Sequence, residues 1–404
     1  MKILIIHQAY YPEMSGTARR AKELAESFVS NGHIVQVLTS TPRSYRSFPD
    51  YKYKLFETFN GVSIFRIKTL LEVNKNVFFR MISYFLFCIQ SLKLAIQLSK
   101  QSDIIISIAP LSSGILGSLA KKFSKKHHHF DVPDMLPDLG IAAGMLKNKF
   151  LINFLYKIEK WVYNNSNTIS GCTKGHVKAI KNKGVNHENI SWIPDWIDAS
   201  FFKENKELFT SEVNRLYSFE GKKVISFIGN IGALQKPDTF IEVMKLLKKE
   251  GHDDLLFCFV GDGIMLPALK KMVKNYNLNN VKFLGRVKRE HIPSIMDLSN
   301  VLVTNYVPDP HLDLYVPGKL FEYAISRKPI VMGSNGDAKD LIEKYNLGIS
   351  VAPSDIMSFK KAILTVNDIN YKFNPDIKKF KSDYSINNII SLYNNVLEKI
   401  KLDS

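Results

Sequence analysis

Short apolar runs alternate with amphipathic helical patterns along this chain, and the alternation starts twice. The first series opens with KILIIH at residues 2–7, followed by a helical pattern with Gly32 at its C-cap position and by IVQVLTS at 34–40. The second series opens near Lys222 with KKVISFIGNIG and continues to VLVTN at 301–305. Strands that alternate with helices pair in parallel, so the pattern predicts an α/β fold of two Rossmann-like, doubly wound domains.

The length of the chain, 404 residues, exceeds what one hydrophobic core usually supports. We expect an N-terminal domain over residues 1–200 and a C-terminal domain over residues 222–380. The polar, weakly periodic stretch from Asp195 to Gly221 is predicted to link them. The helical pattern over residues 386–401 is expected to pack back on the first domain.

The chain is strongly basic, with a formal net charge of +17 and a sequence pI near 9.5. This balance predicts an anionic partner such as nucleic acid, an acidic membrane surface or a phosphorylated substrate. No nucleic-acid-binding signature occurs, so nucleic acid is the weakest of the three. The cysteines, Cys88, Cys172 and Cys258, have no paired spacing, which favours a reducing, cytoplasmic location, and the N-terminus has no signal-peptide pattern.

The most apolar segment runs from Val77 to Leu98, but Arg80 and Lys93 interrupt it. The uninterrupted apolar run is shorter than the ~18 residues that a spanning helix needs, so the segment is not expected to cross a membrane. Two interpretations stay open. The segment is either a core helix, or a helix whose exposed aromatic side lies at a membrane interface beside the two basic residues.

Polar and glycine residues follow the first strand, where a ligand would meet the end of a parallel sheet. Gly16 lies in the turn before the first helix, where a missing side chain lets a phosphate or sugar approach backbone N–H groups. His7 ends the strand and is either a substrate contact or a buried, hydrogen-bonded histidine. Arg19 and Arg20 are expected to be solvated helix charges. The fingerprint G-x-G-x-x-G is absent, which argues against a dinucleotide site.

The second series carries glycine-rich loops after two of its strands. FIGNIGALQK places Gly229, Asn230 and Gly232 after a buried strand and Lys236 a short loop later, a pattern that favours a phosphate-binding loop over an ordinary turn. FVGDG places Gly261 and Asp262 at the carboxyl end of another strand, where open α/β sheets bind ligands.

The segment YVPGKLFEY opens a helix with residues suited to a nucleotide. Pro317 and Gly318 lie at the helix start, and Lys319 follows, where it can face phosphate oxygens. Glu322, one turn on, can accept hydrogen bonds from vicinal ribose hydroxyls. The alternative is a helix-start glutamate that interacts with its own helix dipole.

Three consecutive histidines, His127 to His129, raise the question of a metal site. Because successive side chains of a strand point to opposite faces, at most two of them share a side. We therefore expect no metal here.

Taken together, these segments resemble family 4 glycosyltransferases, and within them the bacterial enzymes that build O-antigen and capsule repeat units. The resemblance covers nearly the whole chain. It is carried by the motifs YYPEMSG, GHIVQVLT, FDVPDMLPD, WIPDWID, FIGNIGALQK, FVGDG, VKFLGRV and PGKLFEY.

The resemblance implies a GT-B fold, a nucleotide-diphosphate sugar held mainly by the second domain, an acceptor on the first, and transfer with retention of anomeric configuration. It also implies that neither a metal nor another cofactor is needed. By position, Lys236 and Lys319 would stabilise the diphosphate, Glu322 would bind the ribose, and Gly16 would approach the donor. A UDP-sugar, with an N-acetylated deoxyamino sugar, is the donor that the subgroup suggests.

The acceptor side follows from the same resemblance. Asp131 and Asp134, which come after a strand, are the acceptor-side candidates, and structural capping is the alternative for either. A lipid-linked saccharide would be the acceptor, and the enzyme would work peripherally on the inner face of the cell membrane.

Two departures from the family pattern keep other functions open. Leu314 stands where the first of the family's two glutamates would fall, with Asp313 beside it, and Asn230 replaces the arginine of the phosphate loop. A catalytically inactive docking subunit of a membrane glycosyltransferase complex is one alternative. A sugar-nucleotide epimerase is the other, although it needs paired acid and base groups around the sugar.

Overall fold

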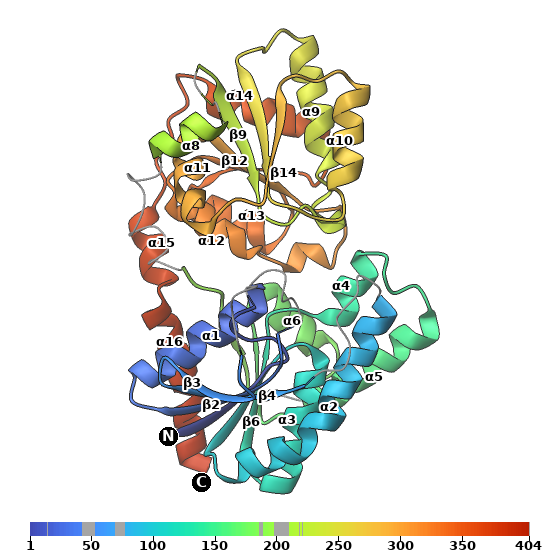
Figure 1. Cartoon of the computed structure of the whole chain (residues 1–404), viewed down its shortest axis with the longest axis vertical. Coiled ribbons are helices and arrows are strands. Elements are labelled where there is room, and N and C mark those ends of the chain that lie inside the picture. Colours follow the sequence, from blue (N-terminus) through green and yellow to red (C-terminus); the bar gives the residue numbers. More distant parts are fainter. Residues whose placement is uncertain are drawn as a thin grey trace. The chain divides into compact units, whose positions relative to one another are not determined.

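The computed structural model describes residues 1–13, 15–42, 53–68, 77–185, 189–197, 210–217, 219 and 221–403, without the side chains of 77–80 and 399–403. The chain divides into two compact units (Figure 1). The first contains Met1–Asp195 together with Ile386–Ser404, and the second is Trp196–Ser385. Each unit is an α/β sheet covered by helices.

The sheet of the first unit has eight strands in the order β3-β4-β2-β1-β5-β6-β7-β8. Every neighbouring pair is parallel except β3–β4, which forms an antiparallel hairpin at one edge. The strands are β1 (Lys2–Ile6), β2 (Ile34–Ser40), β3 (Phe56–Phe59), β4 (Val62–Ile67), β5 (Ile104–Ile108), β6 (His127–Val132), β7 (Thr168–Gly171) and β8 (Ile190–Trp192).

Helices connect these strands as a doubly wound fold requires. They are α1 (Gly16–Ser30), α2 (Val77–Lys100), α3 (Leu111–Ser124), α4 (Leu136–Ala142), α5 (Lys149–Asn165), α6 (Lys174–Asn182) and, from the C-terminal end of the chain, α16 (Ile386–Asp403). Helix α1 begins where Ser15 accepts a hydrogen bond from the N–H of Ala18. The helix reaches only Ser30, so Asn31 rather than Gly32 is its C-cap, and Gly32 follows with a φ of +80°.

The second unit has a six-stranded, fully parallel sheet in the order β11-β10-β9-β12-β13-β14. Its strands are β9 (Lys223–Ile228), β10 (Leu255–Val260), β11 (Val281–Gly285), β12 (Val301–Asn305), β13 (Ile330–Gly333) and β14 (Gly348–Val351). Its α-helices are α8 (Thr210–Tyr217), α9 (Asp238–Lys249), α10 (Leu266–Asn275), α11 (Ile292–Leu298), α12 (Gly318–Ile325), α13 (Asp337–Lys344), α14 (Ile356–Asn367) and α15 (Ile377–Asp383). The prediction of parallel α/β architecture in both halves is confirmed.

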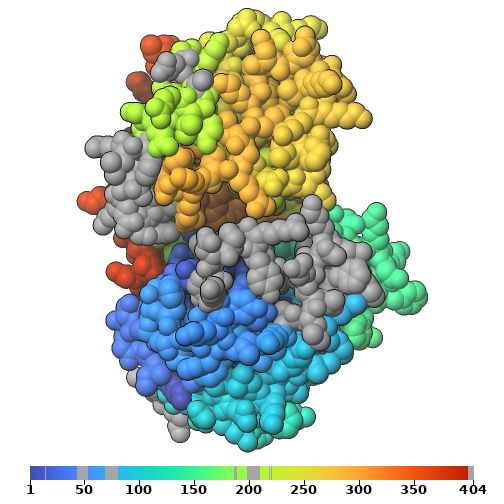
Figure 2. Space-filling view, viewed as in Figure 1, coloured from blue at the N-terminus to red at the C-terminus, as the bar shows by residue number. Residues whose placement is uncertain are grey.

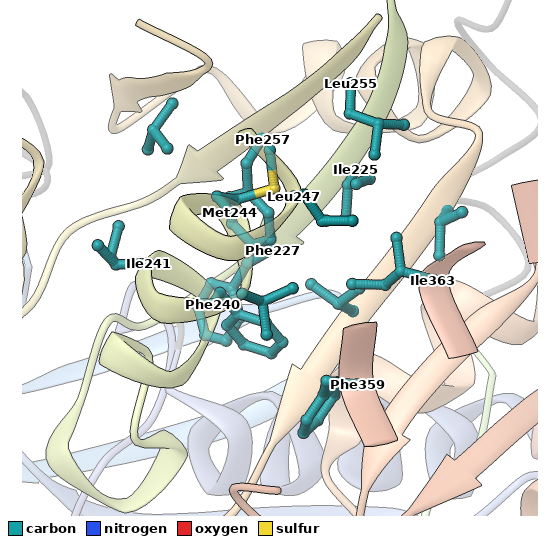
Figure 3. Packing of buried hydrophobic residues seen from close by; sticks show 14 of the residues in the cluster. Ile225, Phe227, Phe240, Ile241, Met244, Leu247, Leu255, Phe257, Phe359 and Ile363 are labelled. Carbon is teal, nitrogen blue, oxygen red and sulfur yellow. The ribbon is translucent and has the colours of Figure 1, made fainter. Parts of the chain in front are cut away.

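Each unit buries its own apolar core. In the second unit, aromatic side chains of β9, β10, α9 and α14 pack together, and Figure 3 shows Phe227, Phe240, Phe257 and Phe359 among them. Phe240 stacks on Phe257 at 5.3 Å between ring centroids. These contacts fix β9 and the loop that follows it.

Part of the stretch expected to link the two domains is a helix. Within residues 195–221, α8 buries Val213 and the backbone carbonyl of Tyr217 accepts a hydrogen bond from Lys282 Nζ at 3.0 Å. The boundary between the two units falls at Asp195. The weak periodicity of an eight-residue helix hid it in the sequence.

Helix α2 covers the apolar segment singled out in the sequence. By length and composition, Met81–Lys100 meets the criteria for a membrane-spanning helix. The core helices of soluble proteins meet the same criteria. Its inner side chains, Phe87, Ala95 and Leu98, belong to the core of the first unit, while Phe85 and Ile89 are exposed. The helix is therefore part of the packed unit on one side and open on the other.

Candidate functional site

The strand order of the second unit places a topological switch point between β9 and β12. From β9 the chain adds β10 and β11 on one side, and it later adds β12, β13 and β14 on the other. Loops that leave adjacent strands in opposite directions at such a point open a crevice beyond the carboxyl ends of the strands, where open α/β sheets bind ligands. The loop after β9 carries Lys236, and helix α12, which follows the loop after β12, carries Lys319.

Glycines let the loops after β9 and β10 pack backbone to backbone. A Cβ on Gly261 would lie 2.0 Å from the carbonyl oxygen of Gly229, and one on Gly263 would lie 2.3 Å from that of Ile231. Gly229 and Gly261 also have φ values of +127° and +130°, which side chains rarely adopt. The close approach of Gly261 is thus to the protein's own backbone.

Lys319, the second residue of α12, has a buried amine. Its Nζ lies 4.0 Å from the centroid of the Phe227 ring and makes no hydrogen bond with any residue that the structure describes. A Cβ on Gly229 would come within 3.1 Å of this nitrogen, so the glycine leaves room for it. Burial lowers the pKa of Lys319 to about 7, against an opposing effect of Glu322. A buried ammonium without a hydrogen-bond acceptor is a site prepared for an anion.

Helix α12 is fixed to the end of β9 by Tyr323. Its phenol oxygen accepts from the N–H of Ile228 at 2.8 Å and donates to the carbonyl of the same residue at 3.1 Å. Glu322 is half-buried and lies one turn from Lys319. Apart from its chain neighbours and its own helix backbone, no described residue has an atom within 4 Å of a Cβ built on Gly318, so there is space beside the start of α12.

Lys236 lies between β9 and α9 with an unusual backbone. Its φ of 38° and ψ of 60° put it in the left-handed region, after the 3₁₀ turn Ala233–Gln235. The carbonyl of Lys236 accepts hydrogen bonds from Thr239 N and from Asn305 Nδ2, at 3.2 and 3.4 Å. A left-handed residue commonly ends a helical turn, and Lys236 is the C-cap of this one.

Three further residues singled out in the sequence, Asp262, Asn230 and Leu314, lie in the loops after β10, β9 and β12. Asp262 accepts from the N–H of Gly263 at 2.7 Å and pairs with Arg286 at 3.2 Å on the surface, and Asn230 is exposed. Leu314, at the position of the missing glutamate, lies in the 3₁₀ turn Leu312–Leu314 of the loop between β12 and α12.

In the first unit the switch point lies between β1 and β5, and His7 is at it. The strand order runs from β1 to β2 on one side and to β5 on the other. His7 is buried, and its Nδ1 donates to the carbonyl of Ile108 at the end of β5, at 3.1 Å. Gly16 is the exposed first residue of α1, with no atom within 4 Å of a built Cβ. Both residues thus lie at the carboxyl edge of this sheet.

Arg20 is the centre of a buried ionic cluster, which corrects the expectation of a solvated helix charge. The residue is 3% exposed and its guanidinium contacts Asp131 at 2.7 and 3.2 Å and Asp195 at 2.8 Å. It also donates to Tyr393 OH of α16 at 3.1 Å and to the carbonyl of Ile193 at 3.1 Å. Sequence spacing could not reveal these partners, because they lie more than 100 residues apart along the chain.

The two aspartates predicted on the acceptor side have different environments. Asp131 is fully buried and accepts from Arg20, Tyr393 and Ser170, which occupies both of its oxygens. Burial raises the pKa of Asp131, but Arg20 outweighs this effect and holds the pKa below its usual value. For Asp134, burial and then the charge of Asp195 raise the pKa to about 6.

The three histidines of β6 contact hydroxyl groups. His129 lies 2.9 Å from Thr168 Oγ1 and 3.0 Å from Ser170 Oγ, and His128 lies 2.6 Å from Ser107 Oγ. Among the described residues, no group of three or more His, Cys, Asp or Glu side chains is placed to hold a metal ion.

Comparison with protein families assigns the second unit. The family described as glycosyl transferases group 1 matches residues 210–379. The chain is 24% identical over 357 residues, covering 85% of this chain and 84% of the relative, to a putative colanic acid biosynthesis glycosyl transferase, WcaI, of Escherichia coli. It is also 27% identical over 165 residues, 41% of this chain and 44% of the relative, to an N-acetyl-D-galactosaminyltransferase of Campylobacter jejuni whose name includes a diNAcBac-PP-undecaprenol glycan.

Solved structures share the fold of the whole chain. The structure of HepE from Anabaena in complex with UDP and glucose has a TM-score of 0.73 at 14% identity and covers 99% of both chains. Sucrose-phosphate synthase from Thermosynechococcus elongatus has a TM-score of 0.80 at 13% identity over the full length of both. These likenesses show the fold.

Proposed function

Because the chain is a group 1 glycosyltransferase of GT-B fold in bacterial polysaccharide biosynthesis, we propose that it transfers a sugar from a UDP-sugar to a lipid-linked saccharide, with retention of configuration and without a metal. The second unit binds the donor and the first binds the acceptor. The observation that carries the proposal is the buried amine of Lys319 at the switch point of the second sheet, which makes no hydrogen bond with the described part of the chain.

The nucleotide part of the donor is assigned to the loops after β9 and β12. Lys319 and Lys236 contact the diphosphate, and the open start of α12 at Gly318 offers N–H groups to phosphate oxygens. Glu322 accepts from the ribose hydroxyls. Gly229 and Gly261 shape these loops, while Asn230 and Asp262 lie at their exposed tips. The neighbouring structures that contain UDP support the choice of nucleotide.

The reaction breaks the bond between C1 of the sugar and the phosphate oxygen and forms a bond from C1 to an acceptor oxygen. Negative charge grows on the leaving phosphate while the sugar becomes oxocarbenium-like. Two lysines stabilise that charge in place of a divalent cation. The leaving phosphate takes the proton of the acceptor hydroxyl, which balances the reaction without a protein base.

The first unit supplies the acceptor side. Asp134 is the residue proposed to orient the acceptor hydroxyl through a hydrogen bond, while the leaving phosphate takes the proton. Asp131 acts through position, because its oxygens are held by Arg20, Tyr393 and Ser170. His7 and Gly16, at the carboxyl edge of the same sheet, are proposed substrate contacts, with Gly16 next to the transferred sugar or its phosphates.

Calorimetric binding of UDP, GDP and ADP to the wild type and to Glu322→Ala tests the donor site. We expect micromolar binding of UDP and its collapse in the variant, since the loss of a carboxylate leaves the ribose hydroxyls unpaired. Glu343→Ala, on the exposed side of α13, is the control and is expected to bind UDP as the wild type does. Absence of binding by all three nucleotides would contradict the donor site and favour a docking subunit without activity.

The lipid-linked acceptor places the enzyme at the inner face of the cell membrane. Support comes from the net charge of +17 and from the undecaprenol-linked name of the Campylobacter relative. A basic protein is attracted to the anionic cytoplasmic leaflet.

A further inference from the structure

Helix α5 presents an aromatic stripe on the side that faces away from the protein. Phe150 is 88% exposed, Phe154 is 59% exposed and Trp161 is 41% exposed. With Lys157 they follow each other at spacings of four, three and four residues, which places them on one line along the helix. Figure 2 shows this teal-green part of the first unit at its outer surface.

The opposite side of α5 packs against the rest of the first unit, so the aromatic stripe faces solvent. Glu159, Val162 and Tyr163 are buried on that side. A Cβ on Gly114 of α3 would come within 2.6 Å of Val162, so α3 and α5 are in close contact there. A surface helix normally carries polar residues on its outer side, and α5 carries apolar ones on both.

The exposed charges around the stripe are all positive. Lys147, Lys149, Lys157 and Lys160 are exposed, and none of them forms an ion pair with a residue that the structure describes. The only acidic residue of α5, Glu159, is buried and paired with Lys183 at 2.7 Å. Met145, 50% exposed, adds apolar area at the N-terminal end of the helix.

We propose that this face of α5, defined by Phe150, Phe154, Lys157 and Trp161 with the flanking lysines, is the surface by which the protein binds an anionic lipid leaflet. A helix with aromatic residues on its outer side and lysines along it matches a membrane interface, where rings enter the acyl boundary and ammonium groups stay at the phosphates. A nucleic acid is disfavoured as the partner because no nucleic-acid-binding motif occurs in the chain. The inference rests on the proposed function, of which it specifies the membrane contact.

Cosedimentation of the full chain with vesicles tests this surface. We expect binding to phosphatidylcholine vesicles that contain about one third phosphatidylglycerol, and little binding to phosphatidylcholine alone. Phe150→Ser combined with Phe154→Ser should lower the partition coefficient about tenfold or more. Gln in place of Lys149, Lys157 and Lys160 should lower it about fivefold per lysine at low salt.

Matched variants identify the helix responsible. Phe85→Ser with Ile89→Ser removes two exposed apolar residues of α2, and Met357→Ser with Ile369→Ser removes two from the second unit. Both are expected to bind vesicles as the wild type does. Brominated lipid should quench the tryptophan fluorescence of the wild type more than that of Trp161→Phe, because Trp161 enters the membrane interface.

The result that overturns the proposal is loss of vesicle binding in the α2 variant with full binding in the α5 variant. A change of molar mass in light scattering for the α5 variant, with unchanged lipid binding, would overturn it in favour of a second copy of the chain. UDP calorimetry on every variant shows, independently of vesicle binding, whether the variant is folded and whether its donor site is intact. If the wild type binds UDP but does not bind vesicles, the proposed lipid-binding surface is rejected and the proposed transferase function is not.

Discussion

At the scale of single residues, Lys319 links function to a cost in stability. In the unfolded chain its pKa is near 10.5, and in the folded protein it is about 7. Between these values the unfolded state binds more protons, so the folded state loses stability as the pH falls from 10.5 towards 7. A residue that costs stability at physiological pH is retained for what it binds.

We therefore expect Lys319→Met to raise the free energy of unfolding at pH 7 by more than about 1 kcal/mol in the absence of nucleotide. The same variant should lose the stabilisation that UDP gives the wild type. Denaturant unfolding with and without UDP measures both effects. Lys361→Met, on the exposed side of α14, should change neither, and a destabilised Lys319→Met would contradict this account.

The same lysine predicts that nucleotide binding takes up a proton. A diphosphate next to Nζ favours the ammonium form, so a group with a pKa of about 7 when free becomes protonated on binding above that pH. UDP affinity should then weaken as the pH rises through and beyond 7. Calorimetry at about pH 8 in buffers of different ionisation enthalpy measures the uptake. Lys319→Arg should bind UDP without taking up a proton. If this variant takes up as many protons as the wild type, Lys319 is not the group that is protonated on binding.

Gly261 of the second unit and Gly16 of the first are expected to have different roles, the first in stability and the second in activity. Gly261→Ala places a Cβ 2.0 Å from the carbonyl of Gly229 at a φ of +130°, and should destabilise the second unit by about 2 kcal/mol or more. Gly16→Ala meets no atom within 4 Å and lies in the first turn of α1, where alanine favours the helix. We expect Gly16→Ala to keep or raise the melting temperature and to lower transfer activity. Unchanged activity would remove Gly16 from the site.

At the scale of elements, the Arg20 cluster holds four segments together. Arg20 of α1 contacts Asp131 of β6, residues 193–195 where the chain leaves the first unit, and Tyr393 of α16 where it has returned. Breaking a buried ion pair by removing one partner leaves an uncompensated charge. Through Tyr393, this cluster joins α16 to the sheet by polar contacts.

Arg20→Met should lower the free energy of unfolding by about 3–5 kcal/mol, and Tyr393→Phe by about 1–2 kcal/mol. Because the pKa of Asp131 lies below its unfolded value of 3.8, the wild type should lose this contribution as the pH falls below that value. Urea unfolding as a function of pH measures both. Lys22→Met, which removes a partly buried pair with Glu26 on the same helix, should cost no more than about 1 kcal/mol.

At the scale of the whole molecule, the two units differ in how the chain builds them. The second unit is one continuous segment with its own core, whereas the first needs the C-terminal helix. A fragment of residues 196–385 should therefore fold and bind UDP with near wild-type affinity. A fragment of residues 1–195 lacks Tyr393 and should be less stable than the same unit in the full chain. Circular dichroism melting and UDP calorimetry of the fragments measure this, and an unfolded 196–385 fragment would contradict the independence of the second unit.

The periodicity of apolar residues determined the fold class from sequence alone. The strands β9, β10 and β12 are buried runs bounded by glycine or polar residues, and such runs, alternating with amphipathic helices, have few other ways to bury their surface. The loop residues of the second unit were identifiable for a related reason. A glycine directly after a buried parallel strand, such as Gly229 or Gly261, lies at the carboxyl edge of the sheet in any strand order.

Tertiary structure alone decided the electrostatic environments. The pKa of Lys319 depends on burial against Phe227, opposed by Glu322, and the pKa of Asp131 depends on Arg20, which lies 111 residues away along the chain. The outward direction of Phe150 and Phe154 on α5 likewise depends on which side of the helix α3 covers. Periodicity reports which residues share a face, whereas burial, pKa and partners are set by contacts between segments distant in sequence.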